Sequence, residues 1–246
     1  MITLLVLSKY QEIFDQFLAS YERYGKEDIQ HKRLLVAEPG VTAPPDWRVV
    51  EFHDKYSQPR IMNFAMEFTE GDVAFFSDDV QLTHSFTILD LSDAAYSRSD
   101  LGVVSPRIDG EVYNGLQRGS VAEPGPVALT EAICHVCMYF REQALIDAGG
   151  WDERMIGDSW EDVDHCMSLG KAGWKCGVTP TVVVKHGFGG RGDSCTWTRK
   201  TDRMPNGMAY NQGIFQEKWR GKLDFLPPLQ PLGPISVVLK QLQEGK

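Results

Sequence analysis

Carboxylates gather in one short segment of the chain, residues 149–174, with the sequence GGWDERMIGDSWEDVDHCMSLGKAGW. Asp158 precedes Glu161 by three positions and Ser159 precedes Asp162 by three. These overlapping capping-box patterns predict that a helix begins here. In its first turn the helix dipole favours an ionised Asp162, which could serve as a general base. The alternative is that Glu161 and Asp162 only cap the helix.

A second acidic group follows a predicted buried strand. The run DVAFF at 72–76 ends in Ser77, Asp78 and Asp79. Adjacent carboxylates at the end of a buried strand repel each other and are costly to desolvate, and a bound cation would remove that cost. Mg²⁺ and Mn²⁺ take oxygen ligands and leave coordination positions for substrate phosphates. The alternative is an ordinary polar turn before a helix near residues 86–96.

A histidine and several basic residues come later in the chain. The apolar run TVVVK at 181–185 delivers His186 at its carboxyl end, where the side chain could be a ligand or a surface residue. Beyond it, Arg191 and Arg199 lie in a Gly-rich, polar segment without clear periodicity. Such a loop could close over a diphosphate through charge-assisted hydrogen bonds, or it could be an ordinary solvated loop.

Alternating strands and helices must position these residues. Such alternation predicts an α/β fold with a Rossmann-like, mostly parallel sheet whose ligand crevice lies at the carboxyl ends of the strands. Ser8 and Tyr10, just past the first strand, are therefore candidate ligand-binding residues. Apolar runs predict strands at 2–8, 32–37, 47–52, 72–76, 101–106, 132–141 and 181–185, and helical periodicity predicts helices at 11–24, 59–68, 142–148 and 209–220.

Composition limits the classes of function. The chain has 246 residues and a formal net charge of -9 at pH 7, which argues against bulk nucleic-acid binding because that needs a basic face. Its five cysteines, an odd number, fit reduced thiols and a cytoplasmic location. The C-x-x-C formed by Cys134 and Cys137 is interpreted as part of a buried strand. No signal peptide and no membrane span are expected.

The order of these features resembles the family 2 glycosyltransferases with the GT-A fold, over about residues 2–220. The runs MYFREQALIDAGGWDE and WEDVDHCMSLGKAGWKCGVTPTVVVKH are similar to that family's strand, helix, Gly-Gly-aromatic turn, Glu-Asp-x-Asp helix and strand ending in histidine. The run FSDDV at 76–80 resembles its Asp-x-Asp motif, and the segment from Asn211 to Trp219 resembles its closing helix. The resemblance implies one GT-A domain at 1–225, with a donor half at about 1–105 and an acceptor half at about 106–225, and a C-terminal tail at 226–246.

A reaction is also implied by the resemblance. A sugar would move from a nucleotide-diphosphate sugar to an acceptor hydroxyl, with inversion. Asp79 would bind Mn²⁺ or Mg²⁺, with His186 as a further ligand, and Asp162 would remove the proton of the acceptor hydroxyl. Ser77 stands where the family has its first aspartate, so either Ser77 or Asp78 completes the metal site.

The two substrates have separate expected contacts. Glu38 stands where the family has paired aspartates that hold the base and ribose, and Arg60 and Asn63 resemble donor-side residues. The acceptor is expected against the loop at 109–125 and could be a saccharide, a glycolipid headgroup or a small molecule. The full expected donor set is Ser8, Tyr10, Glu38, Arg60, Asn63, Ser77, Asp78, Arg191 and Arg199, and the expected acceptor set is Trp151, Trp160 and Glu161.

Two other functions remain open on sequence alone. A sugar nucleotidyltransferase also needs a nucleotide crevice and acidic metal ligands, although Ser8-Lys9-Tyr10 is a poor version of the Gly-rich phosphate loop that it requires. An inactive carbohydrate-binding module on the same fold is favoured by the substitution at Ser77. The combination of Asp79, Asp162 and His186 favours the transferase. The sequence does not determine the oligomeric state.

Overall fold

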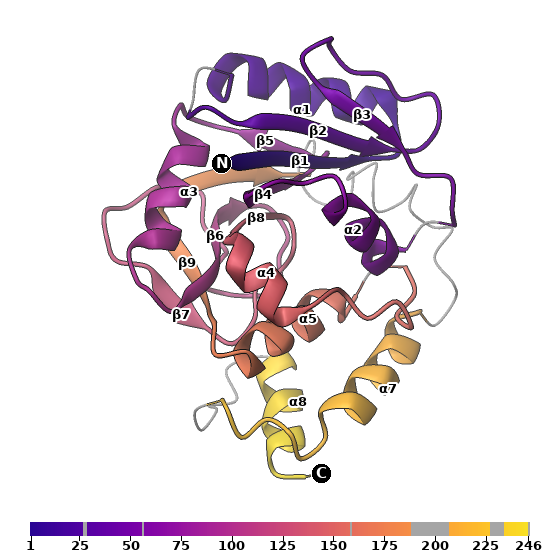
Figure 1. The fold of residues 1–246 in the computed structure, drawn as a ribbon. Coiled ribbons are helices and arrows are strands. Elements are labelled where there is room, and N and C mark those ends of the chain that lie inside the picture. Colours follow the sequence, from indigo (N-terminus) through magenta and orange to yellow (C-terminus); the bar gives the residue numbers. More distant parts are fainter. Residues whose placement is uncertain (27–28, 56, 158, 188–206, 227–233, 246) are drawn as a thin grey trace.

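The structure is a computed structural model, and it describes residues 1–246 except 27–28, 56, 158, 188–206, 227–233 and 246. Strands and helices alternate along most of the chain (Figure 1). The strands are β1 (Ile2–Ser8), β2 (Lys32–Ala37), β3 (Arg48–Glu51), β4 (Asp72–Ser77), β5 (Val80–Leu82), β6 (Leu101–Asp109), β7 (Ala128–Thr130), β8 (Cys137–Phe140) and β9 (Lys175–His186). The helices are α1 (Gln11–Tyr24), α2 (Gln58–Met66), α3 (Thr87–Tyr96), α4 (Glu142–Ala148), α5 (Glu161–Lys171), α7 (Gly207–Trp219) and α8 (Pro234–Gln243).

The strands form one mixed sheet in the order β3-β2-β1-β4-β8-β6-β9-β5, and β7 also pairs with β9. Neighbours among β3, β2, β1 and β4 are parallel, as expected where helices connect them. Strand β8 is antiparallel to both β4 and β6, and β5 and β7 are antiparallel to β9. The carboxyl ends of β1, β2 and β4 therefore meet at one edge of the sheet.

Both faces of the sheet are covered, which explains why β1 is mostly apolar and buried along its whole length. Its side chains alternate between two hydrophobic clusters. Leu5 and Leu7 pack in a cluster with residues of α2, α4, α5, α7 and α8. Leu4 and Val6 pack on the opposite face with residues of α1 and α3. The α/β fold predicted from the apolar runs is confirmed.

One predicted strand is much shorter than expected. The apolar run at 132–141 gives only β8, because the backbone of residues 132–136 pairs largely outside the sheet ladder. The carbonyl of Ala132 accepts a hydrogen bond from Asn114, and the Cys134 N–H donates to Gln117 Oε1 over 2.6 Å. Apolar composition alone could not reveal these two polar partners. The short strands β5 and β7 were likewise not predicted.

The start of α5 also differs from its prediction. The helix begins at Glu161 with Trp160 as its N-cap, and no side chain caps it. The predicted capping box from Ser159 is wrong, because the Ser159 backbone N–H instead donates to the Glu161 carboxylate. Its overlapping partner Asp158 lies outside the described residues.

The C-terminal segment folds back onto the domain. Leu239 and Leu242 of α8 are each 1% exposed and belong to the same cluster as Leu5. The side-chain amide of Gln243 donates to the Leu226 carbonyl over 3.0 Å, and the Gly221 N–H donates to the Leu242 carbonyl. The segment is therefore a packed helix below the sheet in Figure 1. Within the described part of the chain, no helix has the length and apolar character needed to cross a membrane.

Candidate active site

A crevice opens at the carboxyl ends of β1, β2 and β4. The parallel register pairs Leu7 with Ser77, so the next residues, Ser8 and Asp78, leave their strands side by side. The Ser8 hydroxyl donates to Asp78 Oδ2 over 2.7 Å, and both residues are almost fully buried. This hydrogen bond closes the floor between the two strand ends. The crevice is lined by Leu7, Ser8, Lys9, Tyr10, Glu38, Gln58, Ile61, Phe75, Ser77 and Asp78.

The crevice holds five of the predicted donor-side residues and one cation that was not predicted. Ser8, Tyr10, Glu38, Ser77 and Asp78 all line it. Lys9 Nζ lies 3.6 Å from Glu38 Oε1, so an ammonium group lies beside the Glu38 carboxylate. The sequence could have indicated Lys9 as a site residue, because it directly follows the first strand. No comparable signal marked Gln58, which begins α2.

The second carboxylate of the motif has a different neighbour. Asp79 Oδ2 lies 3.5 Å from His186 Nε2, and the two side chains are 2% and 10% exposed. The antiparallel register of β5 with β9 pairs Val80 with His186, which brings the end of β9 back to the turn after β4. The two sequence motifs, more than a hundred positions apart, therefore form one pair.

The chemistry of this pair fits a divalent cation. His186 Nδ1 lies 3.1 Å from the Glu111 carbonyl, which can only accept a hydrogen bond, so Nδ1 carries the proton. The unprotonated Nε2, whose lone pair can bind a metal ion, faces Asp79. Metal-binding histidines characteristically use their second nitrogen in this way. Among the described residues no three or more His, Cys, Asp and Glu side chains form a metal-binding group. Asp79 and His186 would thus supply two ligands, leaving the other positions to water and phosphate.

Asp162, at the start of α5, is a buried carboxyl with several donors around it. It is 6% exposed, and its Oδ1 accepts the Val163 N–H over 2.7 Å. Burial raises the pKa of Asp162 to about 6, while hydrogen bonds from the Val163 N–H, the Tyr113 side chain and the His135 backbone act against that rise. A carboxylate with this pKa is ionised at neutral pH and still basic enough to accept a proton.

Residues 134–136 lie between Asp162 and the Ser77–Asp79 turn. The Val136 carbonyl accepts the Ser77 N–H over 2.9 Å, and the His135 backbone hydrogen-bonds to Asp162. Cys134 is held by Gln117, which also donates to the Cys134 carbonyl over 3.1 Å. The candidate base and the Ser77–Asp79 turn therefore contact adjacent residues, His135 and Val136, of one short segment.

The backbone before α5 is strained. Ser159 has a φ of 122° and Trp160 a φ of 67°, values that residues other than glycine rarely adopt. Such conformations cost about 1–3 kcal/mol each and persist only where the surroundings hold them. Glu161, an expected acceptor residue, is 6% exposed, and its carboxylate accepts the Ser159 N–H inside this turn.

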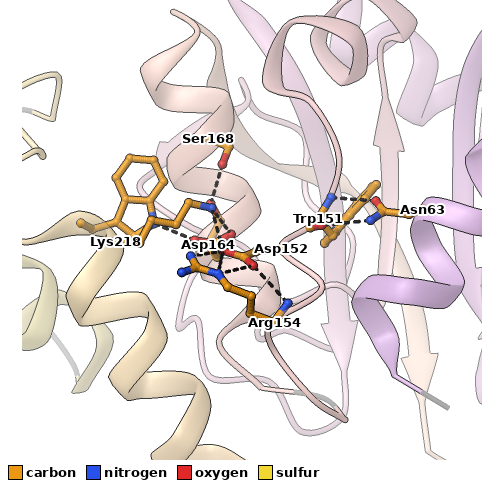
Figure 2. A network of polar contacts seen from close by, with 8 residues as sticks. Asn63, Trp151, Asp152, Arg154, Asp164, Ser168 and Lys218 are labelled. Atoms are coloured by element: carbon orange, nitrogen blue, oxygen red, sulfur yellow. Dashed lines mark hydrogen bonds and ion pairs between the residues drawn. The ribbon is translucent and has the colours of Figure 1, made fainter. Parts of the chain in front are cut away.

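Two of the expected contact residues have structural partners instead. Trp151 is 4% exposed and stacks on His165 with ring centroids 3.8 Å apart, so no face of its ring is left for an acceptor. Asn63 exchanges hydrogen bonds with the Trp151 backbone, at 2.8 Å and 2.9 Å (Figure 2). It also donates to Glu153. Asn63 thus ties α2 to the turn that follows α4, and neither Asn63 nor Trp151 lines the crevice.

The remaining predicted residues are placed as follows. Arg60 is outside the crevice lining and pairs with Asp54 over 3.2 Å. The Trp160 ring is half-buried and packs on Phe215 with ring centroids 5.0 Å apart. Arg191 and Arg199 lie outside the described residues. Tyr113, which lies within the predicted acceptor loop, was not singled out from the sequence although it hydrogen-bonds to Asp162.

No protein-family model matches the chain, and no curated protein matches its sequence. Solved structures do match. A mannosyltransferase, PcManGT from Pyrobaculum calidifontis, in complex with GDP-Man and Mn²⁺, has a TM-score of 0.64 at 14% identity, over 98% of this chain and 69% of the other. GalNAc-T7 with UDP, GalNAc and Mn²⁺ has a TM-score of 0.65 at 11% identity, over 98% of this chain and 54% of the other.

A third matching structure comes from Staphylococcus: S. aureus TarS 1-349 in complex with UDP-GlcNAc, with a TM-score of 0.62 at 14% identity. It is matched over 91% of this chain and 68% of its own. At such low identities the likeness establishes the architecture. Together with the sheet order and the strand-end crevice, it shows that the chain has the GT-A fold of these glycosyltransferases.

Proposed function

We propose that the protein is a metal-dependent glycosyltransferase that moves a sugar from a nucleotide-diphosphate sugar to an acceptor hydroxyl with inversion. The observation that carries the proposal is the Asp78–Asp79 turn. Asp78 closes the floor of the crevice through Ser8, and the next residue, Asp79, pairs with His186. One turn thus joins the crevice at the strand ends to a carboxylate and imidazole pair that suits Mn²⁺ or Mg²⁺.

The crevice supplies the contacts that a nucleotide-diphosphate sugar needs. Lys9 places an ammonium group in the crevice, beside Glu38, which suits a diphosphate. Glu38 and the Tyr10 ring lie at the same opening, where a ribose and a base could be held. Solved structures of the same fold contain GDP-Man, UDP and UDP-GlcNAc, which supports a nucleotide-linked donor for this chain.

A divalent cation held by Asp79 and His186 would neutralise the diphosphate leaving group. Two of the solved structures contain Mn²⁺, which supports the same kind of ion here.

Asp162 provides the base that the reaction needs. Its carboxylate accepts the proton of the acceptor hydroxyl while that oxygen forms a bond to the anomeric carbon of the sugar. The bond between the anomeric carbon and the diphosphate oxygen breaks on the opposite face, and the nucleoside diphosphate leaves. The Val163 N–H fixes the direction of the carboxylate, and burial gives it a pKa of about 6. Correct placement and charge stabilisation would supply most of the rate increase.

A panel of nucleotide sugars tests the proposal directly. The wild-type protein is incubated with each sugar and Mn²⁺, and release of nucleoside diphosphate is measured with and without EDTA. Release that needs both one nucleotide sugar and the metal is expected. Release of pyrophosphate from a nucleoside triphosphate and a sugar phosphate would instead identify a nucleotidyltransferase, and no reaction in either assay would contradict both enzymatic functions.

Binding provides a readout that does not depend on turnover. Mn²⁺ is titrated calorimetrically into the protein with UDP or GDP present, and the His186→Gln variant is compared with His84→Gln, whose histidine lies outside the pair. Loss of metal affinity in His186→Gln alone is expected. Equal affinities in the two variants would remove His186 from the metal site.

A further inference from the structure

The turn before α5 is held by a neighbouring helix rather than by its own helix cap. The N-cap Trp160 makes no side-chain capping hydrogen bond. Both Ser159 and Trp160 nevertheless keep positive φ angles. A strained pair of non-glycine residues directly before two carboxylates is the kind of feature that concentrates at functional sites.

Asn211, on α7, makes the hydrogen bonds that hold this turn. Its side chain is fully buried. Its Oδ1 accepts the Ile156 N–H over 2.9 Å, and its Nδ2 donates to the carbonyls of Ile156 and Ser159, each over 2.9 Å. These three hydrogen bonds tie Ile156 and Ser159 to one side chain of α7. An alanine in this place would leave the same partly buried backbone groups without these partners.

A second contact from α7 acts on the other strained residue. The Phe215 ring, four positions after Asn211 and so on the same face of the helix, packs on the Trp160 ring with centroids 5.0 Å apart. Phe215 is itself fully buried. One face of α7 therefore fixes both residues of the strained turn.

We propose that Asn211 is a positioning residue for sugar transfer, which holds the Ser159–Trp160 turn in the conformation that sets the direction of Asp162. The proposal rests on the proposed function of Asp162 as the base. Asp162 is the second residue of α5, so the path of the backbone through Ser159 and Trp160 determines where its carboxylate lies. Asn211 does not touch the carboxylate and acts only through this turn.

A double-mutant cycle with Ser159→Gly tests the proposal. Asn211→Ala is expected to lower kcat by about 10- to 100-fold, because a small displacement of a catalytic group has that effect. The donor KM should change less than about two-fold, since the crevice is not part of the turn. Glycine adopts positive φ without strain. In the Ser159→Gly background, Asn211→Ala should therefore cost much less activity. Gln212→Ala, its neighbour on α7, is the matched control and should leave kcat unchanged.

Three outcomes would overturn the proposal. The first is a folded Asn211→Ala protein with the kcat of the wild type. The second is an equal loss of kcat from Asn211→Ala with and without Ser159→Gly. The third is a rise in donor KM without a fall in kcat. If Asn211→Ala alone does not fold, the comparison is made in the Ser159→Gly background, where Asn211→Ala should fold and should keep most of the activity of Ser159→Gly.

Hydrogen exchange separates this proposal from the proposed function. Amides of residues 156–163 should exchange faster in Asn211→Ala than in Gln212→Ala, and adding Ser159→Gly should restore part of the protection. If the wild type transfers no sugar from any donor, the proposed function fails, whereas the exchange data still show whether Asn211 holds the turn. If transfer occurs and exchange is unchanged in Asn211→Ala, the positioning role alone is wrong.

Discussion

Lys218 Nζ lies 2.7 Å from Oδ2 of the buried Asp164, so an ion pair joins α7 to α5 two residues after the candidate base (Figure 2). Trp219 Nε1 donates to the other carboxylate oxygen over 2.7 Å. Burial raises the pKa of Asp164, and Lys218 opposes that rise. Lys218 also lies 3.7 Å from Asp152, which Arg154 binds at 2.6 Å. The docking of α7 therefore depends on a buried charge with a small set of partners.

Removing Lys218 should destabilise the protein more than removing both members of the pair. In Lys218→Met the Asp164 carboxylate stays buried with its main cation gone, and the free energy of unfolding should fall by about 3 kcal/mol. In Lys218→Met/Asp164→Asn the uncompensated charge is absent, so the loss should be smaller. Urea unfolding of both variants and of the Asp164→Asn single variant provides the coupling energy.

The control for this cycle is Lys222→Met, which removes an exposed ammonium group just after α7. Its free energy of unfolding should stay within about 0.5 kcal/mol of the wild type. Equal stabilities of Lys218→Met and Lys222→Met would show that the pair contributes nothing measurable to the docking of α7.

The pH dependence of transfer should report Asp162. Its carboxyl must be ionised to accept a proton, and burial raises its pKa to about 6. Activity, as kcat/KM, should therefore rise as the pH increases through about 6 and become constant above it. Asp162→Asn should lower kcat by about 10²- to 10⁴-fold while donor binding changes little. A flat profile between pH 5 and 8 in the wild type would remove Asp162 from the role of base.

Tyr113→Phe should move that profile to higher pH. The Tyr113 side chain hydrogen-bonds to Asp162 and thereby lowers the pKa of the carboxyl. Without the hydroxyl the ionised form loses one donor, so a higher pH is needed to reach the same fraction of base. The matched control is Tyr10→Phe, which changes a hydroxyl in the crevice and should leave the midpoint of the profile in place. A midpoint that does not move in Tyr113→Phe would show that the hydrogen bond has no effect on the base.

Much of this site could be predicted because its residues follow buried strands. The apolar runs of β1, β4 and β9 ended at Ser8, Asp78 and His186, and in a sheet the ends of such strands gather at one edge. The α/β class and the burial of β1 follow from the same apolar runs.

Other parts depend on contacts between distant residues, which local patterns do not contain. The hydrogen bonds of Asn63 to Trp151 and of Asn211 to Ile156 and Ser159 join residues more than fifty positions apart. The local capping pattern also could not reveal Asn211 of α7, which donates to the Ser159 carbonyl in the turn before α5. The sequence also could not show that Trp151 is buried, because its stacking partner His165 comes from the next helix.

Acid should destabilise the protein through His165, which is fully buried and stacked on Trp151. Burial lowers its pKa to about 3, whereas a histidine in the unfolded chain has a pKa of about 6.5. Below pH 6.5 the unfolded chain binds a proton that the native protein does not, so the stability contributed by His165 is present above that pH and is lost as the pH falls towards 3. Asp162 acts in the opposite direction between about pH 6 and 4, because its native pKa is raised.

From pH 7.5 to 5, His165 should account for a loss of unfolding free energy on the order of 2 kcal/mol. In His165→Phe the loss of unfolding free energy over this interval, measured with urea, should be smaller by that amount, while His53→Phe, at an exposed position, should show the wild-type loss. The same pH dependence in all three proteins would contradict a neutral, buried His165.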